Sequence, residues 1–161
     1  MAIIKSSQYK EMPWKNGGGR TAEIDRVPQT ERYLWRVSSA TVSVDGEFSL
    51  FPGFERLLVV IRGPGLWLNE TKLEPLKPFR FPGEQPINCR LIGGEVRDLG
   101  LIFDREKVRA EMICISEERP KPAKDLLASY IFDLDSGNTY KDVAVCPVKR
   151  GILISVADTR I

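Results

Sequence analysis

The sequence predicts an all-β protein built as a sandwich or a barrel. Short apolar segments typical of strands recur along the 161 residues, Gly or Pro turns separate them, and no window sustains a helical period with capping residues. The predicted strands are residues 34–44, 56–62, 66–68, 79–81, 88–91, 95–103, 108–116, 129–134, 143–145 and 151–156. One short helix is predicted at residues 123–129, after a Pro-containing connection at 117–124.

Two of these segments carry the clearest patterns. Residues 34–44 are rich in β-branched side chains and end at Asp45-Gly46, a pair typical of a hairpin turn. Residues 56–62 are almost wholly Leu, Val and Ile, which indicates a strand buried on both faces. Because side chains alternate along a strand, one face of residues 35–44 carries Arg36, Ser38, Ala40, Val42 and Val44. This face changes from polar to apolar, as the wall of a lined cavity does, although an edge strand with polar residues in solvent gives the same pattern.

Composition limits the class of protein. The chain holds 24 Lys and Arg against 22 Asp and Glu, has a formal net charge of +2 and is 42% hydrophobic. It is long enough to bury a real core, and its hydrophobic content is too high for a disordered protein. Its longest apolar run, residues 57–61, is far shorter than a membrane-spanning helix. We expect no membrane and, because the charge is near neutral, no nucleic acid among its partners.

The chain has no histidine. Zinc or non-haem iron sites that depend on imidazole, and triads of the Ser-His-Asp or Cys-His type, are therefore excluded. Proton chemistry would fall to Asp, Glu, Lys, Tyr or Cys. No carboxylate cluster has the spacing of a metal-binding loop, so we predict neither a metal nor another cofactor.

The three cysteines are widely separated, and none forms a Cys-x-x-Cys pair. Cys89, Cys114 and Cys146 have apolar neighbours, which predicts small buried side chains in strands. The N-terminal residues lack the apolar stretch of a secretory signal. Together these features predict a reduced, cytoplasmic setting.

The most distinctive segment is PWKNGGGRT at residues 13–21. Consecutive glycines allow unusual backbone conformations, and successive N–H groups in such a turn can form an anion-binding nest beside Lys15 and Arg20. A tight crossover of the chain without a ligand is the alternative. The order of a Walker A loop is absent, and no βαβ unit surrounds the glycines. The candidate ligand-binding residues of this segment are Trp14, Lys15, Asn16, Gly17, Gly18, Gly19 and Thr21.

Two further segments place charges on predicted strands. Glu55 and Arg56 follow a Pro-Gly turn, where they either face a pocket or pair with other side chains. Asp98 lies inside an apolar strand, where its carboxylate must be solvated, hydrogen-bonded or paired. It is either a structural acceptor for nearby backbone N–H groups or a residue of a binding site.

Five segments, taken in order, resemble the signature of the Ves/HutD family. They are PWKNGGGRTAEI at 13–24, WRVS at 35–38, DGEFSLFPGFER at 45–56, FRFPGEQP at 79–86 and GGEVRD at 93–98. Ordered blocks over most of the chain are far more specific than a single glycine motif. Where many members carry Asp-Phe-Asn-x-Met, this chain has DLGLI at 98–102. If that Asn contacts the ligand in relatives, the ligand here differs or binds more weakly.

The resemblance implies a cupin-type β-barrel of the RmlC-like jelly-roll kind, in a compact bicupin whose second half is degenerate. It implies one domain at residues 1–161, with a first barrel at about 1–116 and a smaller β half at about 117–161 that completes it. It also implies a cytoplasmic bacterial protein linked with histidine utilisation. Regulatory binding of a pathway metabolite such as N-formylglutamate has been proposed for members of the family.

The first function hypothesis is a metal-free barrel that binds a small organic anion and acts as a sensor or regulator. Two arginines, Arg36 and Arg56, would hold a carboxylate of this anion. The other residues of the candidate site orient it or line the site, and they are Ser38, Glu55, Asp98 and the residues of the glycine segment given above.

The second hypothesis is a metal-free enzyme of the lyase or epimerase type. Its base would be Glu23, Glu55 or Asp98, and its acid Lys15 or Tyr33. No pair of these residues has a spacing that demands catalysis, so we favour the binding protein. Cupins commonly dimerise through strand edges, although no feature of this sequence specifies a homodimer.

Overall fold

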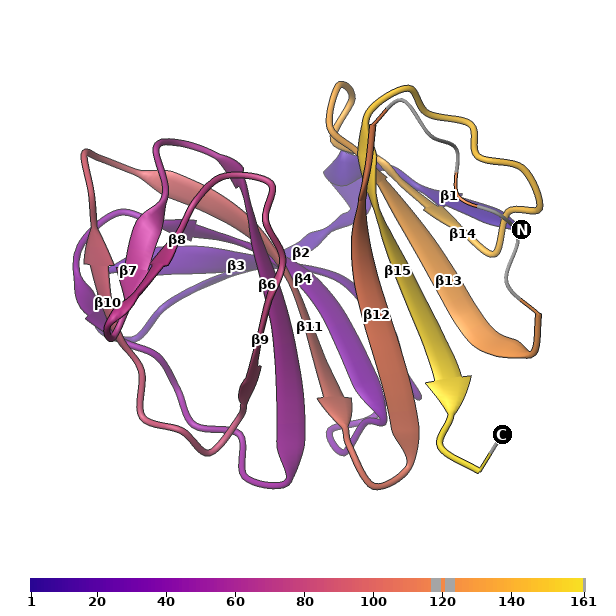
Figure 1. Ribbon diagram of the computed structural model, residues 1–161, viewed down its shortest axis with the longest axis horizontal. Coiled ribbons are helices and arrows are strands. Elements are labelled where there is room, and N and C mark those ends of the chain that lie inside the picture. The colour runs from indigo at the N-terminus through magenta and orange to yellow at the C-terminus, as the bar shows by residue number, and fades with distance from the viewer. Residues whose placement is uncertain (117–119, 121–123, 161) are drawn as a thin grey trace. The chain divides into compact units, whose positions relative to one another are not determined.

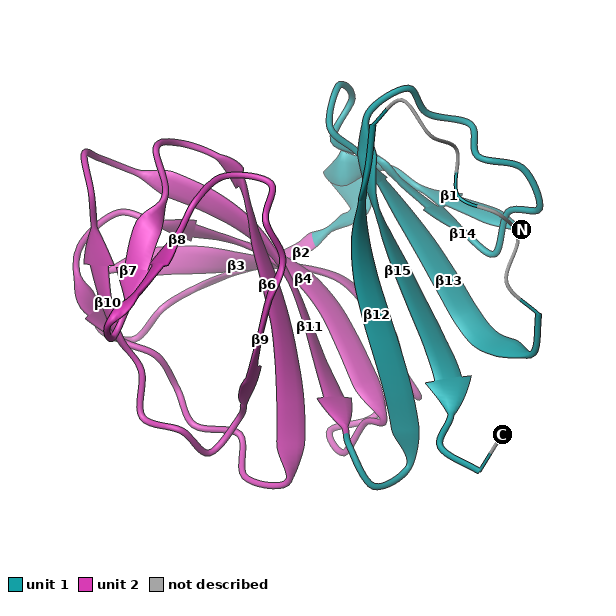
Figure 2. Cartoon of the chain, in the orientation of Figure 1, with its two compact units in different colours: residues 1–9, 105–161 teal, residues 10–104 magenta. Residues whose placement is uncertain are grey.

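The computed structural model describes residues 1–116, 120 and 124–160. These residues form an all-β chain with one short 3-10 turn, η1 (Ser6–Gln8) (Figure 1). The chain divides into two compact units, residues 10–104 and residues 1–9 with 105–161 (Figure 2). The border after residue 104 precedes the predicted start of the second half at 117, and the bicupin description stays a prediction. Among the described residues, no helix has the length and apolar character needed to cross a bilayer.

The unit of residues 10–104 contains two antiparallel sheets. The six-stranded sheet has the order β2 (Lys10–Pro13), β3 (Gly19–Val27), β4 (Trp35–Val42), β11 (Val96–Asp104), β6 (Phe54–Arg62) and β9 (Phe79–Pro82). The four-stranded sheet has the order β5 (Gly46–Glu47), β10 (Asn88–Leu91), β7 (Leu66–Leu68) and β8 (Thr71–Leu73). The sheets do not close into one barrel, so the unit is an open jelly roll.

The core of this unit draws apolar side chains from both sheets. Leu58 and Val60 come from β6, whereas Leu66 and Leu68 come from β7. The other buried members of this cluster are Val42, Leu73, Phe81, Ile87, Cys89 and Val96. We call the face of the six-stranded sheet that carries Leu58 and Val60 the inner face.

The unit of residues 1–9 and 105–161 contains a five-stranded antiparallel sheet. Its order is β1 (Ala2–Ile4), β14 (Thr139–Lys141), β13 (Leu126–Asp133), β15 (Gly151–Asp158) and β12 (Val108–Ile115). Ile115, Ile131 and Val148 form a buried cluster. Tyr9 fixes the N-terminal segment to this sheet, because its hydroxyl donates to the carbonyl of Gly137 at 2.7 Å.

Two predicted elements near the C-terminus are wrong. Residues 143–145 are not a strand; the strand there is β14, which ends at Lys141 before Asp142 turns the chain with a φ of 56°. Residues 126–129 of the predicted helix begin β13, which pairs with β15, while residue 123 lies outside the described residues. Strand pairing overrides the weak helix preference of this Leu- and Ala-containing segment.

The Asp45-Gly46 pair does not form the predicted hairpin. After β4 the chain passes to the other sheet, where Gly46 pairs with Cys89 of β10. Asp45 fixes this crossing, because its Oδ1 accepts the N–H of Leu91 at 2.7 Å. The pair thus marks a sharp turn, but the turn joins two sheets rather than two neighbouring strands.

Candidate functional site

The strand register brings two arginines into one row of the inner face. Antiparallel partners point to the same face of a sheet, and Ile102 of β11 pairs with Arg36 on β4 and with Arg56 on β6. We call these three residues the arginine row. Two residues further along β11, Gly100 pairs with Ser38 and with Leu58. We call these three the glycine row, and Leu58 places both rows on the inner face.

Arg56 lies among aromatic rings. Its guanidinium carbon is 5.3 Å from the ring centre of Phe48, 5.2 Å from that of Phe51 and 5.0 Å from that of Phe81. Within the described part of the chain, it has neither a hydrogen bond nor an ion pair. Burial lowers the pKa of Arg56 to about 10; the charge of Arg36 adds to this effect and Asp98 opposes it. The group nevertheless stays cationic at neutral pH.

Arg36 is the second cation of the row. Its guanidinium carbon lies 5.7 Å from the ring centre of Phe51 and 5.8 Å from that of Tyr33. The Nε atom of Arg36 is buried and, among the described residues, has no hydrogen-bond partner. Its nearest carboxylate oxygen is Oε1 of Glu23, at 4.0 Å. One ring, Phe51, therefore faces both guanidinium groups of the arginine row.

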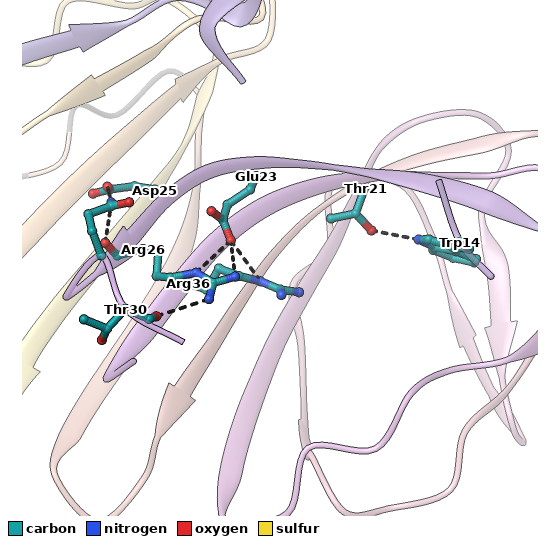
Figure 3. Close-up of polar contacts among 8 residues, drawn as sticks. Trp14, Thr21, Glu23, Asp25, Arg26, Thr30 and Arg36 are labelled. Carbon is teal, nitrogen blue, oxygen red and sulfur yellow. Dashed lines mark hydrogen bonds and ion pairs between the residues drawn. The ribbon is translucent and has the colours of Figure 1, made fainter. Parts of the chain in front are cut away.

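The carboxylate of Glu23 is occupied mainly by Arg26. Oε1 of Glu23 accepts from Nε of Arg26 at 3.0 Å and from its Nη2 at 2.7 Å (Figure 3). Arg26 also donates to the carbonyl of Thr30 at 3.2 Å and lies over the ring of Tyr33. A bulge between residues 23 and 25 of β3 places Glu23 and Arg26 on the same face, although they are three residues apart. Sequence reasoning missed Arg26 because regular alternation assigns these two residues to opposite faces.

Asp98 is buried in β11, where it acts as a structural acceptor. Its Oδ1 accepts the backbone N–H of Ala40 at 3.0 Å, and its own carbonyl accepts the hydroxyl of Ser39 at 2.7 Å. Burial raises the pKa of Asp98 to about 7, which the bond from Ala40 and the charge of Arg56 oppose. Of the two predicted roles, the acceptor for a backbone N–H is therefore present in the structure. Asp98 also lies near the arginine row, since it contributes to the field at Arg56.

The glycine segment forms the tight connection between β2 and β3. The N–H of Gly17 donates to the carbonyl of Trp14 at 3.1 Å, and that of Gly18 donates to Oδ1 of Asn16 at 2.8 Å. These two donors are used inside the loop, so they do not form an open nest. Gly17 has a φ of 74°, which favours glycine. The geometry matches the crossover alternative of the sequence analysis.

Trp14 links this loop to the inner face. Its Nε1 donates to Oγ1 of Thr21 at 2.7 Å, apart from the polar group around Arg36 in Figure 3. Its ring meets Phe48 edge to face at 6.4 Å, and Phe48 in turn contacts Arg56. Trp14 and Thr21 therefore support Phe48, which contacts Arg56, whereas the nearby Lys15 is exposed.

Glu55 is not brought to the inner face. It is next to Arg56 on β6, so it points to the opposite face, where its Oε2 accepts from Nε of Arg80 at 3.0 Å. Arg80 lies over the ring of Phe103. The structure thus brings the predicted residues Arg36, Ser38, Arg56 and Asp98 together on one face with Glu23, a predicted base of the enzyme hypothesis, and it adds Arg26 and the aromatic rings.

The open jelly roll is a cupin-like fold. An RmlC-like cupin protein from Ralstonia eutropha matches it with a TM-score of 0.50 over 63% of this chain and 67% of that one, at 6% identity. Residues 6–139 match the HutD family, and the chain belongs to that family. The predicted family and the cupin-type jelly roll are confirmed.

Three relatives are similar over much of the chain. HutD from Pseudomonas fluorescens SBW25 has a TM-score of 0.85 over 98% of both chains at 30% identity. A conserved protein of unknown function from Pseudomonas aeruginosa PAO1 has a TM-score of 0.84 over 97% of both chains at 24% identity. An uncharacterised 21.2 kDa protein in the hutC 3' region of Pseudomonas putida is 36% identical over 119 residues, which are 70% of this chain and 63% of that protein. The match thus spans less than two thirds of that relative.

The residues of the inner face do not fit the metal that many cupins hold. The chain has no histidine. Across residues 1–116, 120 and 124–160, no group of three Cys, Asp or Glu residues lies close enough together to hold a metal ion. The arginine row offers cations where a metal would need anionic or neutral ligands. Guanidinium groups are suited to pairing with anions rather than with metal ions.

Proposed function

We propose that this protein binds a small organic anion on the inner face of the 10–104 unit and acts as a cytoplasmic sensor or regulator of histidine utilisation. The ligand that we infer is an acidic metabolite resembling N-formylglutamate. Support for the pathway comes from the HutD family and from the Pseudomonas putida relative described as lying in the hutC 3' region. Support for the ligand class comes from the arginine row.

The observation that carries the proposal is the pair of guanidinium groups that face Phe51. Burying a cation is unfavourable unless an anion or hydrogen bonds compensate for the lost water. Within the described residues Arg56 has aromatic contacts and the more distant charge of Asp98 but no hydrogen bond or ion pair, and Nε of Arg36 has no hydrogen-bond partner. The nearest carboxylate, that of Glu23, already accepts from Arg26. A bound carboxylate would compensate both cations of the row at once.

Isothermal titration calorimetry with acetate, glutarate and N-formylglutamate tests this proposal. We expect the wild-type protein to bind carboxylates, and we expect Arg36→Ala and Arg56→Ala each to weaken binding by about tenfold or more, because charged hydrogen bonds are lost. Arg80→Ala is the matched control. Arg80 is also an arginine over a phenylalanine ring, but it pairs with Glu55 on the opposite face.

Besides a wild-type protein that binds none of the acids, two results with the variants would overturn the proposal. One is carboxylate binding that stays unchanged in folded Arg36→Ala and Arg56→Ala proteins. The other is an equal loss of affinity in Arg80→Ala, because a general change of surface charge would then explain the effect. Circular dichroism on each variant establishes that it is folded.

A metal-free lyase or epimerase is the second candidate, and Asp98 favours it. A buried carboxyl with a pKa of about 7 is suited to proton transfer at neutral pH. Glu55 is unsuited to the same role because it lies on the opposite face, paired with Arg80. Turnover of a bound acid that Asp98→Asn abolishes while binding persists would favour the enzyme over the sensor.

A further inference from the structure

Gly100 lies on the inner face, and the backbone does not require a glycine at this position. A Cβ on Gly100 would lie 3.4 Å from Cδ1 of Leu58, 3.7 Å from the carbonyl oxygen of Leu57 and 4.0 Å from that of Ser38. These are ordinary van der Waals contacts. Gly100 is also not among the glycines with a positive φ. An alanine would therefore fit here without moving its neighbours.

Three other buried glycines, Gly65, Gly83 and Gly151, differ from Gly100. At Gly65 a Cβ would lie 2.6 Å from the carbonyl oxygen of Leu73, and φ is positive, whereas at Gly83 a Cβ would overlap the carbonyl oxygen of Phe51. At Gly151 a Cβ would lie 2.6 Å from the carbonyl oxygen of Phe132. Backbone geometry thus explains these glycines. A glycine inside a strand without such a cause often marks a place where a ligand approaches the backbone.

The register places Gly100 between two polar regions of the same face. The arginine row lies at Ile102, two residues from Gly100 in one direction along β11. Asp98 lies two residues from Gly100 in the other direction, on the same face. Two residues along a strand span about 6.8 Å. Ser38 lies beside Gly100 in the glycine row. An anion held by the arginine row and pointing along β11 therefore crosses Gly100 before it reaches the carboxyl of Asp98.

We propose that Gly100 sets the length of the anion that the site accepts. The ligand is an elongated acid whose carboxylate lies on the arginine row and whose second polar group lies roughly 7 Å away, over Gly100 and beside Ser38. This inference rests on the proposed anion-binding function and specifies its substrate class. A side chain at position 100 would occupy the path of the long ligand but leave the carboxylate end free.

A series of acids of increasing length tests the proposal. Calorimetry would measure the affinities of acetate, succinate, glutarate and adipate for wild type, Gly100→Ala and Gly46→Ala. In Gly100→Ala, glutarate and adipate should bind about tenfold more weakly, because the new methyl group occupies space that these ligands fill in wild type. The affinity for acetate should change less than about twofold. Gly46→Ala is the matched control, since a Cβ there would meet only Nδ2 of Asn16, at 3.8 Å.

A second measurement uses the wild-type protein and does not depend on the variant folding. In ¹⁵N-labelled protein, glutarate should shift the amide resonance of Gly100, whereas acetate should leave it in place. An equal loss of affinity for all four acids in Gly100→Ala, or a Gly100 resonance that responds alike to acetate and glutarate, overturns the length role but leaves anion binding intact. Failure of every acid to bind the wild-type protein overturns the proposed function and this inference together.

Discussion

Asp98 brings a carboxyl group into the mainly apolar interior of the 10–104 unit. It stays there because Ala40 donates a backbone N–H to it and because Arg56 lies close enough to act on its charge. The sequence indicated that a carboxylate in this strand needs a partner. It did not indicate which one, because a hydrogen bond to Ala40 depends on the pairing of β4 with β11.

The protonation of Asp98 predicts a protein that loses stability as the pH rises through the weakly acidic range. Burial raises the pKa of Asp98 from 3.8 to about 7, so the unfolded chain releases this proton at a lower pH than the native protein does. The protonated carboxyl of Asp98 makes its full contribution to the free energy of unfolding below about pH 4. This contribution, roughly 4 kcal/mol, is lost by about pH 7. Denaturant unfolding between about pH 4 and pH 8 measures it: the free energy of unfolding of wild type should fall relative to that of Asp98→Asn, whose side chain does not ionise.

Asp158→Asn provides the control for this experiment. Hydrogen bonds from Arg160 lower the pKa of Asp158 to about 2, so its contribution is lost only as the pH falls below the ordinary range of a carboxyl. Between pH 4 and pH 8 the Asp158→Asn profile should run parallel to that of wild type. If the Asp98→Asn profile were parallel as well, Asp98 would ionise at its ordinary pKa in the native protein.

At the scale of elements, the loop between β2 and β3 depends on a close approach at Gly19. A Cβ there would overlap the carbonyl oxygen of Thr41 and lie 3.1 Å from two ring carbons of Trp14. The third glycine of the segment is thus required by packing on β4 and on Trp14. This packing holds the loop and the ring of Trp14 in place, and the predicted role of Gly19 in ligand binding stays a prediction.

Gly19→Ala should therefore lower the free energy of unfolding by about 2 kcal/mol or more, because a backbone clash must be relieved. Thermal or denaturant unfolding measures the change. Gly93→Ala is the comparison, since a Cβ at Gly93 would meet only Cγ of Pro64, at 3.8 Å. Equal stability of the two variants would mean that the loop can move away from Thr41 without loss.

Patterns within a single strand were predictable from the sequence, whereas contacts between strands were not. Alternation along β4 placed Arg36 and Ser38 on one face, and the register confirms that they share it. The bulge in β3 that turns Arg26 toward Glu23 breaks the same rule, so no periodicity could find it. Phe51 and Phe81 meet Arg56 only because the sheet order brings separate segments together. The hairpin expected at 45–46 failed for the same reason, since a turn sequence does not specify which strands it joins.

At the scale of the whole molecule, the three thiols differ in how deeply they are buried. All three cysteines are free; Cys89 is buried, and Cys114 and Cys146 are partly buried. Burial raises the pKa of Cys89 to about 12, and the charges of Asp98 and Asp45 add to this effect. The thiolate is the reactive form, so Cys89 is unreactive at pH 8 unless the protein opens.

Thiol titration of the native protein at pH 8 should therefore modify Cys114 and Cys146 first and Cys89 only with unfolding. Mass spectrometry of the modified peptides identifies the sites, and a sample in denaturant gives the total of three. Glutarate should slow the modification of Cys89 further, because a ligand that binds only the folded state opposes opening. Reaction of Cys89 at the rate of the other two thiols would show that the 10–104 unit opens readily.

Phe51 makes the two arginines of the row energetically interdependent. Its ring faces both guanidinium groups, at 5.7 Å from Arg36 and 5.2 Å from Arg56, and it comes from the connection between β5 and β6. Removing one arginine changes the electrostatic field and the ring contact of the other. The changes in the free energy of unfolding caused by the two single substitutions will therefore not add up to that of the double substitution. A substitution at any one of Arg36, Arg56 and Phe51 therefore changes how much the other two contribute to stability and to anion binding.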